Sequence, residues 1–308
     1  MRLGAVVAAA AYAAGLSDDP PAVDGLDAEF AVLALTVRAA RAMEFTDAPG
    51  ALRALRDAVP FAAEVGPALE GRVVGMIADH RFRTQNAVEA SLEHYDRAIS
   101  LLERTDLDHQ RAEWLVERGV ALHQLSDVQP HRLVEAIRSY QSALVVLDEA
   151  DDPERFALAN MNIGIAILAL PMTQASDQVK LGVAVQSLRA ALRVYGRDSH
   201  PYEWAGCQMN LANALQYLPS THREDNLREA VDLYEEVLQV RSRMSDPVGF
   251  ARVLANQANA LAHLAAFDDA EERYRDARSL FEGAGERDAT EVIDRQLQQI
   301  AEQREALS

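Results

Sequence analysis

An internal repeat limits what this chain can fold into more than any other feature of its sequence. Similar nine-residue segments begin at residues 117, 162, 210 and 256, so their starts are 45, 48 and 46 residues apart. They are ERGVALHQL (117–125), NIGIAILAL (162–170), NLANALQYL (210–218) and NQANALAHL (256–264). Such a period is typical of arrays in which each unit stacks on its neighbours, because one unit cannot bury its apolar face alone.

A second amphipathic segment follows each of these. In it a small residue is followed by a large apolar or aromatic residue four positions later and a second small residue three positions after that, as in Ala136, Tyr140 and Ala143. That spacing forms one stripe along an α-helix. The second segments span 135–147, 183–195, 229–241 and 269–281, and a further copy lies upstream at 90–102. The sequence therefore predicts two helices per repeat.

Composition agrees with an all-α chain. Of 308 residues, 49% are hydrophobic but only 6% are aromatic, so the core must consist mainly of Ala, Leu and Val, and Ala is the best helix former. Helical patterns also occupy 27–43 and 48–58, and the polar stretch 286–305 is typical of a solvent-facing capping helix. We expect an N-terminal cap or degenerate repeats at 1–60, a repeat array at 61–284 and a capping helix at 285–308.

These patterns resemble the tetratricopeptide repeat, which has small residues at positions 8, 20 and 27 and a large residue at position 24. The last copy fits without adjustment, because Ala258, Leu261, Ala270, Tyr274 and Ala277 fall at positions 8, 11, 20, 24 and 27. The resemblance is strong over 106–283. It implies an all-α superhelical solenoid of antiparallel helix pairs.

The earlier copies are longer between their two helices. The interval from position 8 to position 20 is 12 residues in the last copy and 17, 20 and 18 residues in the three before it. The extra residues predict loops at 126–132, 171–178 and 219–226. In this respect the chain is similar to long-loop bacterial arrays that often accompany caspase-like peptidase domains. No His/Cys pair stands in strand-like sequence, so only the array half of that arrangement is expected.

The resemblance implies that the first helix of each repeat lines a concave groove that binds a protein or an extended peptide. Amides recur at groove positions 6 and 9, and an Asn side chain can donate to a peptide carbonyl and accept from a peptide N–H. This amide ladder consists of Asn162, Asn210, Asn213, Asn256 and Asn259. The alternative is that these amides bond to neighbouring helices and serve the structure alone. Further groove candidates are Glu117, Gln216, Tyr217, Arg252 and His263.

The groove positions also indicate what kind of peptide fits. Clamps for a C-terminal carboxylate in this family use Lys or Arg at position 5, where this chain has Val116, Met161, Met209 and Ala255. A carboxylate-terminal ligand is therefore not expected. Glu113 and Glu117 in the first copy favour a partner with basic residues.

No catalytic or metal-binding pattern stands out. The eight histidines form no HExxH motif, and the chain has no GxSxG, Walker or GxGxxG motif. Cys207 is expected in the core, and the pairs Glu235–Glu236 and Asp268–Asp269 are typical of solvated helix faces. We expect a non-catalytic scaffold or adaptor without a cofactor or metal. Two alternatives stay open: a regulatory protein that senses a ligand or peptide, and an enzyme or accessory subunit with its site in the groove.

Charge and cysteine content bear on partners and compartment. The formal net charge of −18 argues against nucleic acid and anionic membranes as partners. One cysteine permits no intrachain disulfide, which favours a reducing compartment. The Ala-rich opening segment resembles a secretory signal faintly, but Ala is a poor hydrophobe for that role and we interpret the segment as a helix. The sequence predicts a cytoplasmic protein and leaves the partner and oligomeric state open.

Overall fold

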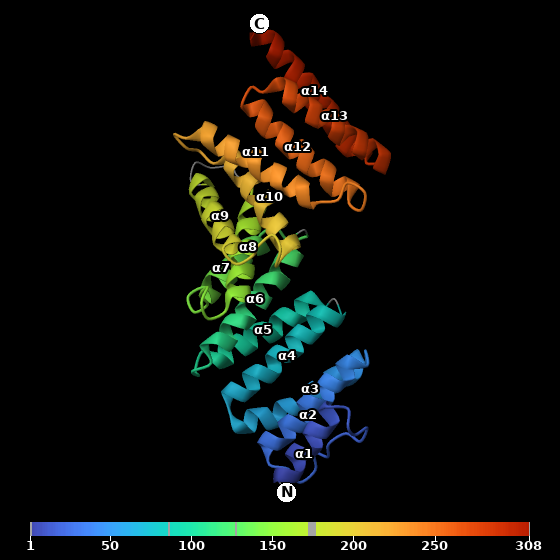
Figure 1. Cartoon of the computed structure of the whole chain (residues 1–308). Coiled ribbons are helices and arrows are strands. Elements are labelled where there is room, and N and C mark those ends of the chain that lie inside the picture. The colour runs from blue at the N-terminus through green and yellow to red at the C-terminus, as the bar shows by residue number, and fades with distance from the viewer. Residues whose placement is uncertain (1, 86, 127, 172–176, 308) are drawn as a thin grey trace. The chain divides into compact units, whose positions relative to one another are not determined.

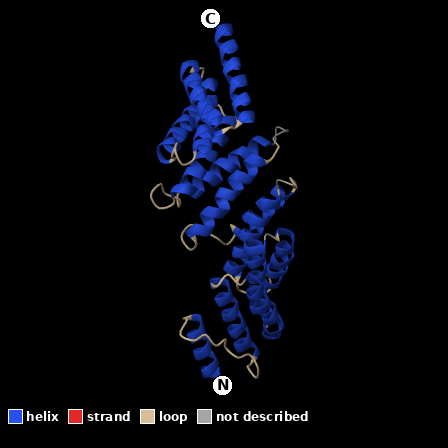
Figure 2. Cartoon of the chain, turned by 90° about the vertical axis from the view of Figure 1, so that its right-hand side faces the viewer, coloured by secondary structure: helices blue, strands red, loops and turns tan. Residues whose placement is uncertain are grey.

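The structure is a computed structural model that describes residues 2–85, 87–126, 128–171 and 177–307 (Figure 1). These residues form 14 helices joined by loops and turns, and they contain no strand (Figure 2). The prediction of an all-α chain is confirmed. The chain divides into two compact units, residues 1–155 and 156–308, which we describe separately.

In the first unit each helix packs against the next along the chain. The helices are α1 (Arg2–Ala13), α2 (Ala28–Glu44), α3 (Ala48–Val65), α4 (Pro67–Gln85), α5 (Val88–Leu102), α6 (Asp108–Leu125) and α7 (Arg132–Ala143). Small residues allow α6 and α7 to approach closely: a Cβ atom at Gly119 would lie 2.4 Å from the ring of Tyr140. Gly75 on α4 meets the ring of Trp114 on α6 in the same way.

The second unit begins within α8 and continues the same pattern. Its helices are α8 (Pro153–Ala169), α9 (Asp177–Leu192), α10 (Pro201–Tyr217), α11 (Arg223–Val240), α12 (Pro247–His263), α13 (Phe267–Ala284) and α14 (Arg287–Leu307). The last helix packs on α13, and it buries Ile293 and Ile300 while most of its polar residues stay exposed.

The predicted repeat register is confirmed by burial. Every small residue at position 20 is fully buried, and so is the large residue that follows it four positions later in three of the four copies. The position-20 residues are Ala136, Ala184, Ala230 and Ala270, each 0% exposed. Because Ala has no side chain beyond Cβ, it lets the two helices of a pair come into direct contact.

Helix boundaries differ from the prediction at all three loops. At 126–132 the difference is one residue, because α7 begins at Arg132, and Asp127 lies outside the described residues. The segment 219–226 was expected to be loop, yet α11 begins at Arg223. Glu224 and Asp225 occupy its first turn, where carboxylates interact favourably with the helix dipole. Helix α9 likewise starts at Asp177, and residues 172–176 of the loop predicted at 171–178 lie outside the described residues.

Two helices of the first unit also differ from the prediction: α3 is longer than expected, and α4 was not expected as a separate helix. The pattern at 48–58 continues to Val65, because the buried Ala58 and Ala62 keep the packing stripe going past Pro60. Helix α4 was not singled out, since charged residues such as Asp79 and Arg83 interrupt its apolar periodicity.

Enlarging a position-20 residue should force α12 and α13 apart. We expect Ala270→Leu to lower the free energy of unfolding by about 1–3 kcal/mol, because overpacking a close contact strains side chains and backbone. Ala301 is exposed on α14, so Ala301→Leu makes the same chemical change with an effect within about 0.5 kcal/mol. Urea unfolding followed by circular dichroism measures both, and equal effects at the two sites would mean that the register is misplaced.

Candidate functional site

The first helices of the repeats are α4, α6, α8, α10 and α12, and they carry the positions predicted to bind a partner. In each unit, polar side chains of these helices form a cluster. In the first unit it is a set of charged side chains, and in the second it is a set of amides.

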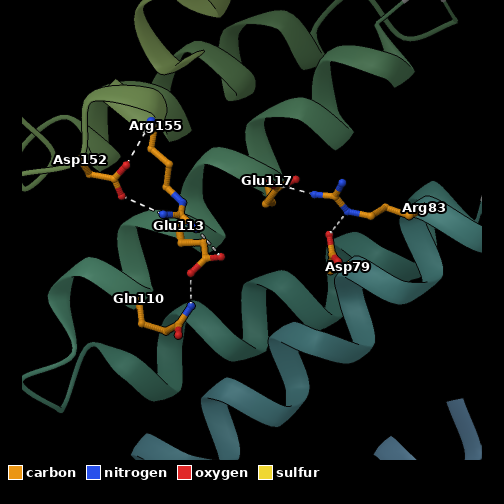
Figure 3. Close-up of polar contacts among 7 residues, drawn as sticks. All are labelled: Asp79, Arg83, Gln110, Glu113, Glu117, Asp152 and Arg155. Atoms are coloured by element: carbon orange, nitrogen blue, oxygen red, sulfur yellow. Dashed lines mark hydrogen bonds and ion pairs between the residues drawn. The ribbon is translucent and has the colours of Figure 1, made fainter. Parts of the chain in front are cut away.

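The charged cluster of the first unit consists of Asp79, Arg83, Gln110, Glu113, Glu117, Asp152 and Arg155 (Figure 3). From α4, Arg83 donates to Asp79 Oδ1 at 2.5 Å and to Glu117 Oε1 on α6 at 3.3 Å. From the start of α8, Arg155 donates to Glu113 Oε1 at 2.8 Å. Both glutamates of α6 therefore already have an arginine partner within the chain.

The remaining contacts fix the second half of the cluster. Arg155 also donates to Asp152 Oδ2 at 2.8 Å, and Gln110 donates to Glu113 Oε2 at 2.5 Å. Glu113 is thus held by two donors on different helices. The sequence did not reveal Arg83 and Arg155 as partners, although Asp79 and Arg83 have the i, i+4 spacing of a helical ion pair.

Glu117 has a perturbed pKa. Burial raises its pKa above the ordinary value of 4.5, the carboxylates Asp79 and Glu113 add to the rise, and Arg83 opposes it. The side chain of Glu117 is 19% exposed and that of Arg83 is 60% exposed. The pair is therefore open to solvent on its arginine side.

The raised pKa of Glu117 predicts a pH-dependent effect on stability. The folded chain holds this proton more tightly than the unfolded chain, so wild-type stability falls as pH rises from the ordinary to the raised pKa. Glu117→Gln has no titratable carboxyl at this position, so its stability does not change with pH for this reason. Its stability relative to the wild type should increase with pH across that window and stay flat above it. Urea unfolding at a series of pH values tests this, and a difference independent of pH would contradict the assignment.

In the second unit the amides form a hydrogen-bonded network, which we call the amide network: Asn213, Gln216, Tyr217, Tyr234, Asn256 and Asn259. Its centre is Tyr234 of α11, which is 0% exposed. The Tyr234 hydroxyl donates to Asn213 Oδ1 at 2.6 Å and accepts from Gln216 Nε2 at 2.5 Å. Sequence reasoning assigned Tyr234 only a packing role, because periodicity shows where a hydroxyl lies but not what it contacts.

The network continues from α10 to α12. Asn256 Nδ2 donates to Asn213 Oδ1 at 3.1 Å. Asn259 Nδ2 lies 3.3 Å from Gln216 Oε1 and 3.2 Å from the Tyr217 hydroxyl. These contacts join two successive first helices. They hold the amides in one arrangement before any ligand is present.

Some hydrogen-bond donors and acceptors of the amide network are not used within the network and face outward. Asn256 Oδ1, Asn259 Oδ1 and Asn213 Nδ2 make no hydrogen bond to the described residues, and none of the three is a buried atom without a partner. Two acceptors and one donor therefore remain open on the half-buried face of α10 and α12. Gln216 differs from its prediction as a groove residue: it is 4% exposed, because its amide is turned inward to Tyr234.

The other predicted residues stand apart from the network. Asn210 donates to Gly206 O of its own helix at 2.8 Å, and Asn162 makes no side-chain hydrogen bond to the described residues. Arg252 and His263 lie exposed on α12, and partial burial together with the Arg223 charge lowers the pKa of His263.

Cys207 is fully buried, and burial raises its pKa to about 12. The prediction that it packs in the core is confirmed. Among the described residues, no three His, Cys, Asp or Glu side chains converge as metal ligands would. Within the same residues, none of the helices combines the length and apolarity that a membrane span needs.

Comparison with known proteins yields no matching family model and no matching curated sequence. Solved structures do match. PilF of Pseudomonas aeruginosa is 16% identical, with a TM-score of 0.52 over 95% of this chain and 99% of PilF. RapI in its apo form is 14% identical, with a TM-score of 0.51 over 91% of this chain and 77% of RapI. At these identities the likeness concerns the fold alone, which is a tetratricopeptide-type array of antiparallel helix pairs.

Proposed function

We propose that this chain is a non-catalytic scaffold or adaptor that binds a protein or an extended peptide on the first helices of its second unit. The observation that carries the proposal is the amide network. Its side chains are fixed by one another, and they still present two acceptors and one donor outward. Such a surface matches a peptide backbone, which offers N–H and C=O groups in alternation.

Hydrogen bonds alone would give weak binding. Three net bonds of about 0.5–1.5 kcal/mol each correspond to millimolar affinity at best. Apolar side chains on neighbouring first helices can add to this, since Met161, Ile165 and Met209 are only half-buried. Methionine adapts its shape to different partners, which suits a surface that binds a backbone with little sequence demand.

The charged cluster of the first unit supports a preference for partners with basic residues. Its side chains comprise four carboxylates and two guanidinium groups, and Arg83 is largely exposed. A lysine or arginine from a partner could take the place of Arg83 beside Glu117. The net charge of −18 supports the same preference and makes nucleic acid a poor candidate.

Two finer points belong to the proposal. The lone, buried cysteine suits a reducing compartment, and we place the protein in the cytoplasm. Its long-loop helix pairs resemble bacterial arrays that often accompany caspase-like peptidase domains, and we take the chain to be an array of that kind.

Position-specific photo-crosslinking in the native host tests the proposal. A photoreactive amino acid at Ala255 or Met209 samples the face of the amide network, and one at Gln239 samples the exposed side of α11. We expect the same discrete adduct from Ala255 and Met209 and none from Gln239. Adducts from Gln239 alone would place the partner on the second helices and reject the proposed site.

A further inference from the structure

A pocket of about 250 Å³ lies between α11 and α13, against one side of α12. Its walls carry Asp232 and Glu235 from α11 and Asp269, Glu272 and Arg273 from α13. Four carboxylates and one guanidinium give a formal charge of −3. Arg273 donates to Glu235 at 3.3 Å, whereas Asp232, Asp269 and Glu272 make no ion pair among the described residues.

Gln257 of α12 lines this pocket, and only the nitrogen of its side-chain amide makes hydrogen bonds. Its Nε2 donates to Glu235 Oε2 at 3.1 Å and to Val231 O at 3.3 Å, so the amide nitrogen faces α11. Its Oε1 is buried and has no hydrogen-bond partner, although the residue is only 2% exposed. A buried acceptor without a donor costs free energy, so an N–H group that reached Gln257 Oε1 would be stabilised there.

The equivalent positions in the other repeats show which side chains can occupy the crevice beside Gln257. In the register of the first helices, Gln257 corresponds to Ile163 and Leu211, which are buried apolar residues, and to Arg118. Arg118 reaches between α5 and α7, where it donates to Asp96 Oδ1 and to Ser139 Oγ, each at 2.6 Å. Asp96 follows Tyr95 as Glu235 follows Tyr234, so the two carboxylates are equivalent.

The first repeat thus fills this crevice with a guanidinium from its first helix, whereas the guanidinium in the crevice of the last repeat comes from Arg273 on α13 and leaves a pocket of about 250 Å³. At the position of Arg118 the last repeat has the neutral amide of Gln257, and three of the four carboxylates in its crevice make no ion pair among the described residues. Two apolar residues, Val231 and Leu261, also line the pocket and can contact the methylene groups of an incoming side chain.

We propose that the pocket between α11 and α13 binds the guanidinium group of an arginine side chain from a partner protein. The planar group would pair with the carboxylates, donate to Gln257 Oε1 and rest its methylene stem on Val231 and Leu261. Gln257 and Leu261 share one side of α12, turned away from the side that carries Asn256 and Asn259. The inference therefore adds a second site and does not depend on the amide network binding a peptide.

Nuclear magnetic resonance titration of the full chain tests this, with the side-chain amide of Gln257 as the reporter. The probe is arginine capped at both termini, at constant ionic strength. We expect a saturable shift of the Gln257 signal. Butylammonium should bind several-fold more weakly, and tetramethylammonium, which has no N–H donor, should produce no saturable shift. Equal responses to all three cations would reduce the effect to charge screening and overturn the proposal.

The source of the guanidinium is tested in the same way. Free arginine adds an α-carboxylate that the four acids repel and an α-ammonium that they attract, so its net charge equals that of the capped form and it should bind no more tightly. Tighter binding of the free amino acid would assign the pocket to a small metabolite and reject a partner's side chain.

Adjacent acids provide a matched control. Glu235 and Asp269 line the pocket, whereas Glu236 accepts from Gln208 and Asp268 pairs with Arg304. We expect Glu235→Gln with Asp269→Asn to weaken binding about tenfold or more, and Glu236→Gln with Asp268→Asn, which changes net charge equally, to leave it nearly unchanged. Similar losses in both pairs would show a general charge effect and contradict the pocket.

One further variant excludes misfolding as the explanation. Gln257→Arg copies the residue that fills the first crevice, so it should abolish binding of capped arginine while the melting temperature is maintained or raised. Because this variant lacks the Gln257 reporter, binding is read from the backbone amide signals of α11 and α13. A Gln257→Arg chain that still binds the probe would overturn the assignment. Arg273→Gln should act in the opposite direction and tighten binding several-fold, because it releases Glu235; weaker binding would contradict the assignment.

Discussion

Replacement of Tyr140 by alanine is expected to lower the free energy of unfolding by about 3–5 kcal/mol. The side chain is 0% exposed, and its ring fills the space that Gly119 leaves open on the facing helix. Alanine would leave a cavity that rigid helix pairs can close only in part. The midpoint of urea unfolding, followed by circular dichroism, gives the measurement.

Tyr140→Phe is the control for this change. The Tyr140 hydroxyl is buried without a hydrogen-bond partner among the described residues, so its removal should cost almost nothing and could stabilise the chain slightly. A large loss with phenylalanine would mean that the hydroxyl, and not the ring, supports the contact.

The second large effect is expected at the equivalent position two repeats later. Tyr234→Phe should lower the free energy of unfolding by about 2–4 kcal/mol, because the buried Gln216 amide loses its acceptor and Asn213 loses a donor. The two Tyr→Phe variants thus make one chemical change at one repeat position with different expected outcomes. If both are neutral, the amide network contributes nothing to folding.

The fold could be predicted from the sequence because packing at the repeat positions is local and periodic. The spacing of Ala270, Tyr274 and Ala277 determines one helix stripe, and all three are buried as expected. Helix α4 could not be identified in the same way, since its charged residues break the stripe. The start of α11 was misplaced because Glu224 and Asp225 are common in loops and equally suited to a first helical turn.

The sites were less predictable, because hydrogen bonds depend on which residues meet across helices. Asn213 and Asn256 are 43 residues apart in the chain, and their contact follows from the stacking of α10 on α12. Glu235 and Glu236 look alike in the sequence, yet only Glu235 lines the acidic pocket. Adjacent helical residues point about 100° apart, so a pair of identical acids can divide between a pocket and open solvent.

The central claim is that the amide network binds the partner. Once crosslinking has identified that partner, its affinity for the full chain should be compared with that for Asn256→Ala combined with Asn259→Ala, and with that for the pocket pair Glu235→Gln and Asp269→Asn. We predict that the asparagine pair weakens binding about tenfold or more while the chain stays folded by circular dichroism. Unchanged affinity for the asparagine pair, with a loss confined to the pocket pair, would contradict the account and move the partner to the crevice between α11 and α13.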